Sequence, residues 1–263
     1  MRRALAAAGA LLCALCAGAP VAGRELRHVV KDPYFGDVLF YFYQDRYFSS
    51  VTDLMVAQHF GRLPHHEDEA EVLRGGLYLS YGLHREAGEI FARLIDRGAP
   101  PPVRDRAWFY LAKIRYQRGQ LALAQEAIGR ILHPLPPDLE EERGLLEANV
   151  LMALGDYAAA AKVLQARGSG SDSSLYVRYN LGVALVKSGD VEGGTQWLDQ
   201  VGRAPAGSEE IGSLRDKANV ALGYATLQDG GTERARGYLE RVRLSGMLSN
   251  KALLGFFVRF RSR

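Results

Sequence analysis

The sequence predicts an all-α fold, a solenoid of about six stacked helical hairpins followed by an incomplete seventh. Three observations support this fold class. A block of residues recurs along the chain, the apolar residues of each block are spaced by three and four, and glycines or prolines separate the segments. The 263 residues, 48% of them hydrophobic, are enough to build the core of such a domain. No series of turn-bounded segments alternates with the period of two that a β protein requires.

Residues 1–23 are predicted to be a secretory signal peptide. Arg2 and Arg3 give it a positive start, and the apolar run at 4–17 is shorter than the roughly 20 residues that cross a membrane as a helix. We expect processing after Ala22 or Gly23, and therefore an exported, periplasmic protein. Removal of this segment takes away both cysteines and leaves 31 basic against 30 acidic side chains. A net charge of +1 gives little reason to expect a nucleic-acid partner.

The repeat at 24–246 can be followed copy by copy through one residue of each first helix. These markers are spaced by 32 to 41 residues, a period of about 34 with loop insertions. They are Val38, Gly75, Ala112, Ala148, Gly182, Gly223 and, in the incomplete copy, Gly255.

Each copy has a large residue, a small residue, a turn residue and then apolar residues at helical spacing. The first copy is the most degenerate and the third is the most complete. In chain order the residues are Tyr34, Tyr41, Tyr47, Ser50, Leu54 and Ala57; Gly75, Tyr78, Gly82, Ala87, Phe91 and Leu94; Trp108, Leu111, Ala112, Gly119, Ala124, Ile128 and Ile131; Ala148, Leu151, Gly155, Asp156, Ala160 and Leu164; Leu181, Gly182, Gly189, Gly194, Leu198 and Val201; and Leu222, Gly223, Gly230, Ala235, Leu239 and Val242.

This residue pattern predicts two helices per copy. The small residues let the two helices approach closely, and the glycine between them allows the backbone conformation that ends the first helix. One hairpin cannot cover its own apolar face, so the copies must stack. Prolines at 64, 100–102, 134, 136–137 and 205 mark the boundaries between copies. The block resembles the tetratricopeptide repeat family over roughly residues 31–255.

That resemblance implies an interaction scaffold whose first helices line a concave groove. In the family, the positions −3, +1, +4 and +5 from the marker face this groove, and here they are mainly aromatic and aliphatic. We therefore expect a partner protein or peptide with apolar side chains, although the superhelix could instead cover part of this stripe itself. The candidate groove residues are Phe35, Phe42, Tyr43, Leu79, Phe109, Lys113, Tyr116, Asn149, Met152, Tyr179, Lys187 and Tyr224.

No catalytic, cofactor or metal site is expected. His59, His65 and His66 stand near an acidic stretch at 67–69, but they lack the spacing of metal ligands. The acidic residues at 67–69, 140–142 and 209–210 are better explained as the first turns of helices, where the helix dipole favours negative charge. The resemblance to exported repeat proteins implies a scaffold in envelope assembly or polysaccharide secretion, and the alternative is a glycan-binding accessory subunit of an envelope enzyme.

Residues 247–263 begin a repeat without finishing it. Leu254-Gly255 matches the marker dipeptides of the two preceding copies, but a short aromatic and basic tail replaces the second helix. Three interpretations remain open: a truncated longer solenoid, a helix that docks on a partner, or a tail that lies on a membrane surface. We expect Phe256, Phe257 and Phe260 to make the isolated protein self-associate.

Overall fold

The computed structural model describes residues 29–168, 174–205, 207–228 and 230–260. These ranges form thirteen α-helices and no strand, which confirms the predicted all-α class. The predicted signal peptide lies outside the described residues, as do the side chains of Phe256, Phe257 and Phe260. Within the described ranges, no helix combines the length and the apolar character that crossing a membrane requires.

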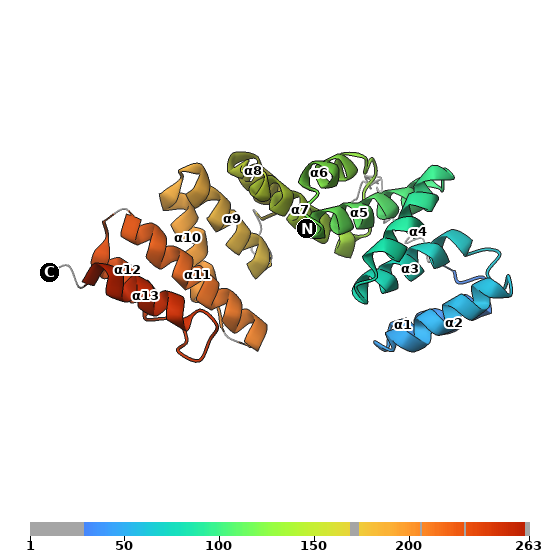
Figure 1. The fold of residues 1–263 in the computed structure, drawn as a ribbon, viewed down its shortest axis with the longest axis horizontal. Helices are drawn as coiled ribbons and strands as arrows, with labels where there is room; N and C mark the ends of the chain where they lie inside the picture. The colour runs from blue at the N-terminus through green and yellow to red at the C-terminus, as the bar shows by residue number, and fades with distance from the viewer. Residues whose placement is uncertain (1–28, 169–173, 206, 229, 261–263) are drawn as a thin grey trace, which may run out of the picture.

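Six hairpins and one last helix follow each other along an arch (Figure 1). The first helices of the hairpins are α1 (Pro33–Phe42), α3 (Glu67–Ser80), α5 (Pro101–Gln117), α7 (Pro137–Ala153), α9 (Leu175–Ser188) and α11 (Glu209–Gln228), and α13 (Ser249–Phe260) begins a seventh unit. The second helices are α2 (Tyr47–His59), α4 (His84–Asp96), α6 (Leu121–Gly129), α8 (Tyr157–Gly168), α10 (Val191–Gly202) and α12 (Thr232–Leu239).

The turn inside each hairpin depends on a residue in the left-handed conformation. Gly155 and Gly189 follow α7 and α9 with φ of 87° and 102°, a region that side chains with a Cβ rarely adopt. The degenerate first copy has Asp45 at this place with φ of 57°. Its carboxylate accepts a hydrogen bond from the Tyr47 hydroxyl at 2.6 Å. A short polar side chain thus replaces the glycine of the other turns.

Small residues lie where the two helices of a hairpin touch. The markers Ala112 and Ala148 are fully buried, and so are Ala124 and Ala160 on the second helices. At Gly182 a Cβ would lie 2.7 Å from Cγ of Leu198 on α10. The predicted close approach of the paired helices is therefore confirmed.

The helices form two layers. The first helices from α3 to α13 contact one another in succession, whereas each described second helix contacts the first helices beside it. The apolar core is divided into local clusters between neighbouring hairpins, as expected for a solenoid. The Phe91 ring of α4, for example, stacks on the Tyr110 ring of α5 with 5.0 Å between centroids. The layer of first helices is the surface on which the predicted groove residues lie.

In three hairpins, a buried aspartate in or just before the first helix forms hydrogen bonds to a residue that follows the second helix. Asp105 of α5 accepts a hydrogen bond from the backbone N–H of His133 at 3.0 Å and lies 2.7 Å from Nδ1 of the same residue. Asp32 accepts a hydrogen bond from the backbone N–H of His65 at 2.9 Å and lies 2.7 Å from Nδ1 of that residue. Asp216 accepts hydrogen bonds from the backbone N–H of Arg243 at 3.1 Å and from its Nε at 2.8 Å. Each carboxylate therefore fixes the segment that follows the second helix of its own hairpin.

The Asp32 contact predicts a dependence of stability on pH. Burial raises the pKa of Asp32, but the hydrogen bonds from the side chain and backbone of His65 and the charges of His65 and His66 outweigh burial, so the net pKa is below the usual 3.8. A carboxyl with a lowered folded-state pKa stabilises above its unfolded pKa and loses that contribution as pH falls through the folded value.

We therefore expect Asp32→Asn to destabilise the protein near neutral pH and the deficit to shrink below pH 3.8. Urea unfolding of wild type and variant across this range measures the difference. Asp37→Asn, at an exposed position of α1, the helix that follows Asp32, is the matched control. A deficit that stays constant down to pH 2 would show that Asp32 does not stabilise the fold through its charge.

Candidate functional site

The middle of the first-helix layer, on α5, α7 and α9, combines polar pairs with partly buried apolar side chains. Lys113 of α5 and Glu142 of α7 form an ion pair with 2.8 Å between Nζ and Oε2. The Lys113 ammonium also lies 5.9 Å from the centroid of the Phe109 ring. Lys113 is thus held between two helices, and its charge is compensated by a neighbour that the sequence analysis did not identify.

Two amide side chains meet across the next pair of helices. Nδ2 of Asn180 on α9 donates a hydrogen bond to Oδ1 of Asn149 on α7 at 3.4 Å. Both residues are half-buried. Each amide has two donor hydrogens and a carbonyl oxygen with two acceptor sites, so this single bond leaves capacity for a ligand. Paired amides of this kind can bind the N–H and C=O groups of an extended peptide backbone.

Partly buried apolar side chains flank these polar pairs. Tyr116, Met152 and Tyr179 each pack one side against the core clusters below them. Burial raises the pKa of the Tyr179 hydroxyl, which is therefore neutral at physiological pH. Leu79 on α3 is partly buried in the same manner. These side chains offer apolar surface that a partner could cover.

Two predicted groove residues are buried by the protein itself, and a third is partly covered by α13. Phe35 is 6% exposed and Phe109 is 0% exposed, so the prediction that these rings line an open groove is wrong. The reason is helical geometry, since each stands three residues before its buried marker and shares its face. Tyr224 is half-buried beside α13, where its hydroxyl donates to the carbonyl oxygen of Lys251 at 2.9 Å.

The remaining predicted residues lie toward the ends of first helices. Tyr43 follows α1 and is 80% exposed, and Lys187 is exposed in the last turn of α9. Phe42 is half-buried, and its ring makes edge contacts with Tyr43 and Tyr47 at 5.5 and 5.6 Å between centroids. They do not join the polar pairs of α5, α7 and α9 in one site.

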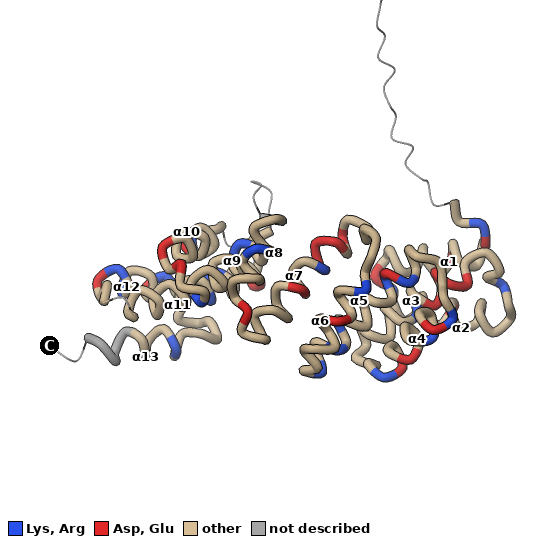
Figure 2. Tube along the Cα trace, turned by 90° about the horizontal axis from the view of Figure 1, so that it is seen from above, with Lys and Arg blue, Asp and Glu red and all other residues tan. Residues whose placement is uncertain are grey.

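The histidines near the acidic stretch have structural partners. His65 contacts Asp32, and His66 stacks on Phe35 at 4.7 Å while its Nε2 accepts the backbone N–H of Lys31 at 2.9 Å. No group of three or more potential ligands that could hold a metal ion occurs in the part of the chain that the structure describes. Basic and acidic residues are interspersed along the solenoid (Figure 2).

Comparisons with known proteins agree with this architecture. The tetratricopeptide repeat family model matches residues 73–138 and 145–208. The structure of YrrB, described as a TPR protein with an unusual peptide-binding site, superposes with a TM-score of 0.56 at 12% identity. The match covers 73% of this chain and 95% of YrrB. BtubC from P. vanneervenii superposes with a TM-score of 0.55 at 17% identity and covers 81% of this chain and 90% of its own. A tetratricopeptide repeat protein from Parabacteroides merdae superposes with a TM-score of 0.54 at 11% identity and covers 85% of this chain and 97% of its own. A search of curated proteins found no match.

The fold and the layer of first helices define a helical-repeat solenoid. The segments 73–138 and 145–208 match the tetratricopeptide repeat family, so the match falls in both halves of the solenoid. The predicted resemblance is therefore confirmed for the repeat itself.

Proposed function

We propose that the protein is an interaction scaffold that binds an extended peptide segment of a partner protein on α5, α7 and α9. The observation that supports this most directly is the amide pair Asn149–Asn180 between partly buried apolar side chains. In this arrangement the amides bind the peptide backbone, while Tyr116, Met152 and Tyr179 contact apolar peptide side chains. Export to the periplasm and a role in envelope assembly or polysaccharide secretion belong to this proposal; export rests on the N-terminal sequence, and the envelope role rests on the resemblance to exported repeat proteins alone.

Peptide selection tests the proposal and does not require the partner protein itself. A displayed library of random 12-residue peptides is selected on the full chain, and the enriched peptides are measured by fluorescence anisotropy. We expect enriched peptides to share spaced apolar residues. Asn149→Ala should weaken their binding roughly tenfold, the effect of losing about one well-made hydrogen bond and leaving its partner unpaired.

The matched control is Phe48→Ala, at a 74% exposed aromatic residue on the second helix α2. It should leave the affinity unchanged. Equal losses for the two variants, or enriched peptides that bind Asn149→Ala as well as wild type, would exclude the amide pair as the binding site. Binding of oligosaccharides but no peptide would favour the glycan-binding alternative.

A further inference from the structure

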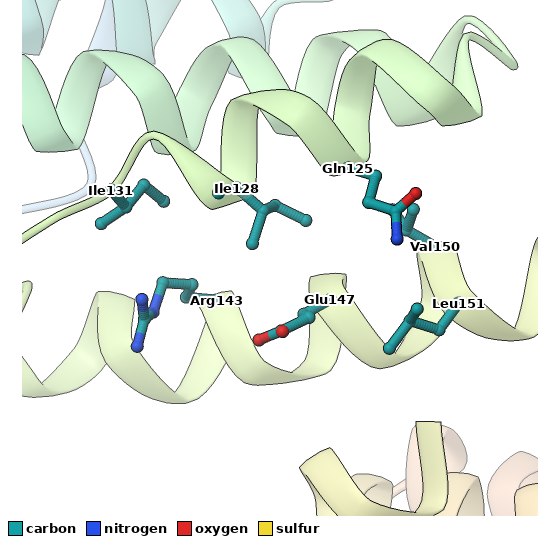
Figure 3. A pocket seen from close by; sticks show the side chains of 8 residues that line it. Gln125, Ile128, Ile131, Arg143, Glu147, Val150 and Leu151 are labelled. Carbon is teal, nitrogen blue, oxygen red and sulfur yellow. The ribbon is translucent and has the colours of Figure 1, made fainter. Parts of the chain in front are cut away.

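A second candidate site lies between α6 and α7, where a cavity of about 350 Å³ opens between successive hairpins. Two rows of side chains face each other across it (Figure 3). Ile128 of α6 and Ile131, which follows α6, line one side of the cavity. Arg143, Glu147 and Leu151 of α7 line the other side. Its volume is within the range of small-ligand sites.

The cavity exists because charged residues replace apolar ones at a packing position. Glu147 stands immediately before the marker of its repeat. The residues at this position in the third, fifth and sixth copies are Leu111, Leu181 and Leu222, which pack into the cores between hairpins. Arg143, five residues before the marker, likewise replaces Ala107, which is fully buried. The second copy also has a charged residue, Arg74, just before its marker, but Ala70 stands five residues before that marker; among the seven markers in the sequence, only that of the fourth copy has charged residues at both positions.

The charges of these two residues are not equally compensated. The Arg143 guanidinium binds the carboxylate of Glu140 one turn earlier on α7. Glu147 is partly buried and has neither a hydrogen bond nor an ion pair to its side chain within the described residues. A carboxylate that is partly removed from water without a partner is destabilising. A bound cation would remove this cost.

The cavity is also separate from the proposed peptide groove. Glu147 and Arg143 are one and five residues before the marker Ala148, whereas Asn149 and Met152 are one and four residues after it. The cavity lies between α6 and α7, and the groove residues of α7 meet α9 instead. The two sites can therefore be occupied independently.

We propose that this cavity binds the long side chain of a lysine or arginine from a partner protein. The cationic end pairs with the Glu147 carboxylate, and the aliphatic stem packs on Ile128, Ile131 and Leu151. The match is one of charge: the Glu147 carboxylate, which has no ion-pair partner within the described residues, lies beside the aliphatic side chains of Ile128, Ile131 and Leu151 in a cavity that Gln125 and the Glu140-paired Arg143 also line. Charge-assisted hydrogen bonds of this kind are stronger than neutral ones.

Methyl NMR of the full chain can test this site directly. The sequence has six isoleucines, of which Ile128 and Ile131 line the cavity, and Ile→Val variants assign their signals. The probe is Nα-acetyl-lysine N-methylamide, and the control probe is the norleucine analogue, which keeps the four side-chain carbons and lacks the ammonium. We expect the lysine probe to shift both signals and to bind at least fivefold more tightly than the norleucine probe, and Glu147→Gln to abolish that preference.

Glu147→Leu provides a second readout that does not depend on a ligand. By introducing the leucine that the third, fifth and sixth copies have at this position, it should close the junction, abolish the response to the probe and raise the melting temperature by about 2–4 °C. Equal responses to the two probes, no response of Ile128 and Ile131, or a lower melting temperature for Glu147→Leu would each overturn the proposal.

Discussion

Phe109→Ala is expected to lower the free energy of unfolding by about 3–5 kcal/mol. The ring is fully buried among Ala112, Ala124 and Val150, and it makes an edge contact with Tyr110 at 5.2 Å between centroids. Replacing it removes a large apolar surface and leaves a cavity between three helices, which the long helices on either side cannot collapse to fill. Urea unfolding followed by circular dichroism measures the loss.

The matched control is Tyr43→Ala, which removes an aromatic side chain that is 80% exposed. We expect a change within about 0.5 kcal/mol, as is usual at exposed positions. If Phe109→Ala were as mild as Tyr43→Ala, the ring would have to face solvent in the groove, as the sequence alone suggested.

Gly194→Val is expected to cost about 3 kcal/mol, at the upper end of the usual range for overpacking. Gly194 of α10 faces Gly182 of α9. A Cβ at 194 would lie 2.6 Å from the carbonyl oxygen of Gly182 and 2.7 Å from the backbone nitrogen of Val186. Backbone atoms inside a helix cannot move aside as a side chain can, so the two helices would have to separate.

Gly237→Ala is the control for this prediction. Gly237 is in α12, and nothing lies within 4 Å of the Cβ that alanine would add. The change should stabilise by up to about 1 kcal/mol through helix propensity alone. If thermal unfolding showed Gly194→Val to be as harmless as Gly237→Ala, the close contact of α9 and α10 would be incorrect.

The repeat and its helices could be predicted because their causes are local. Spacing by three and four defines a helix face, and glycines such as Gly155 end the first helices where the turn requires a left-handed residue. The small residues Ala124 and Ala160 are buried where the pattern placed them. Each of these features depends on residues within one hairpin, and the sequence displays a hairpin as one continuous segment.

The groove residues were harder to predict because burial in a solenoid depends on the neighbouring hairpins. Phe109 and Tyr116 look alike in the sequence, yet one is in the core and the other is at its edge. Asn180 and Glu142 were not among the predicted groove residues because their partners, Asn149 and Lys113, are 31 and 29 residues away on other helices. One signal was visible: an aspartate seven residues before the marker recurs at Asp105 and Asp216, both of which are buried.

The hairpins are packed less closely at the junction of α6 and α7, where a cavity opens, and this junction lies next to the proposed peptide-binding helices. At the junction of α6 and α7 the aliphatic contacts are interrupted by Arg143 and Glu147. Because each unit of a solenoid is stabilised by its neighbours, such a junction is a place where the two halves can separate or accept another group. The groove side chains of α5 and α7, including Lys113 and Asn149, lie on the two helices beside this junction.

The central claim, that a peptide binds on the first helices α5, α7 and α9, is tested most directly by site-specific photo-crosslinking. A benzophenone side chain is placed at Tyr116, at Met152 or at Phe48 on the second helix α2, and each protein is irradiated with a selected peptide. The account predicts crosslinks from Tyr116 and Met152, their loss with excess unlabelled peptide, and none from Phe48. Crosslinks from Phe48 with none from Tyr116 or Met152 would contradict it.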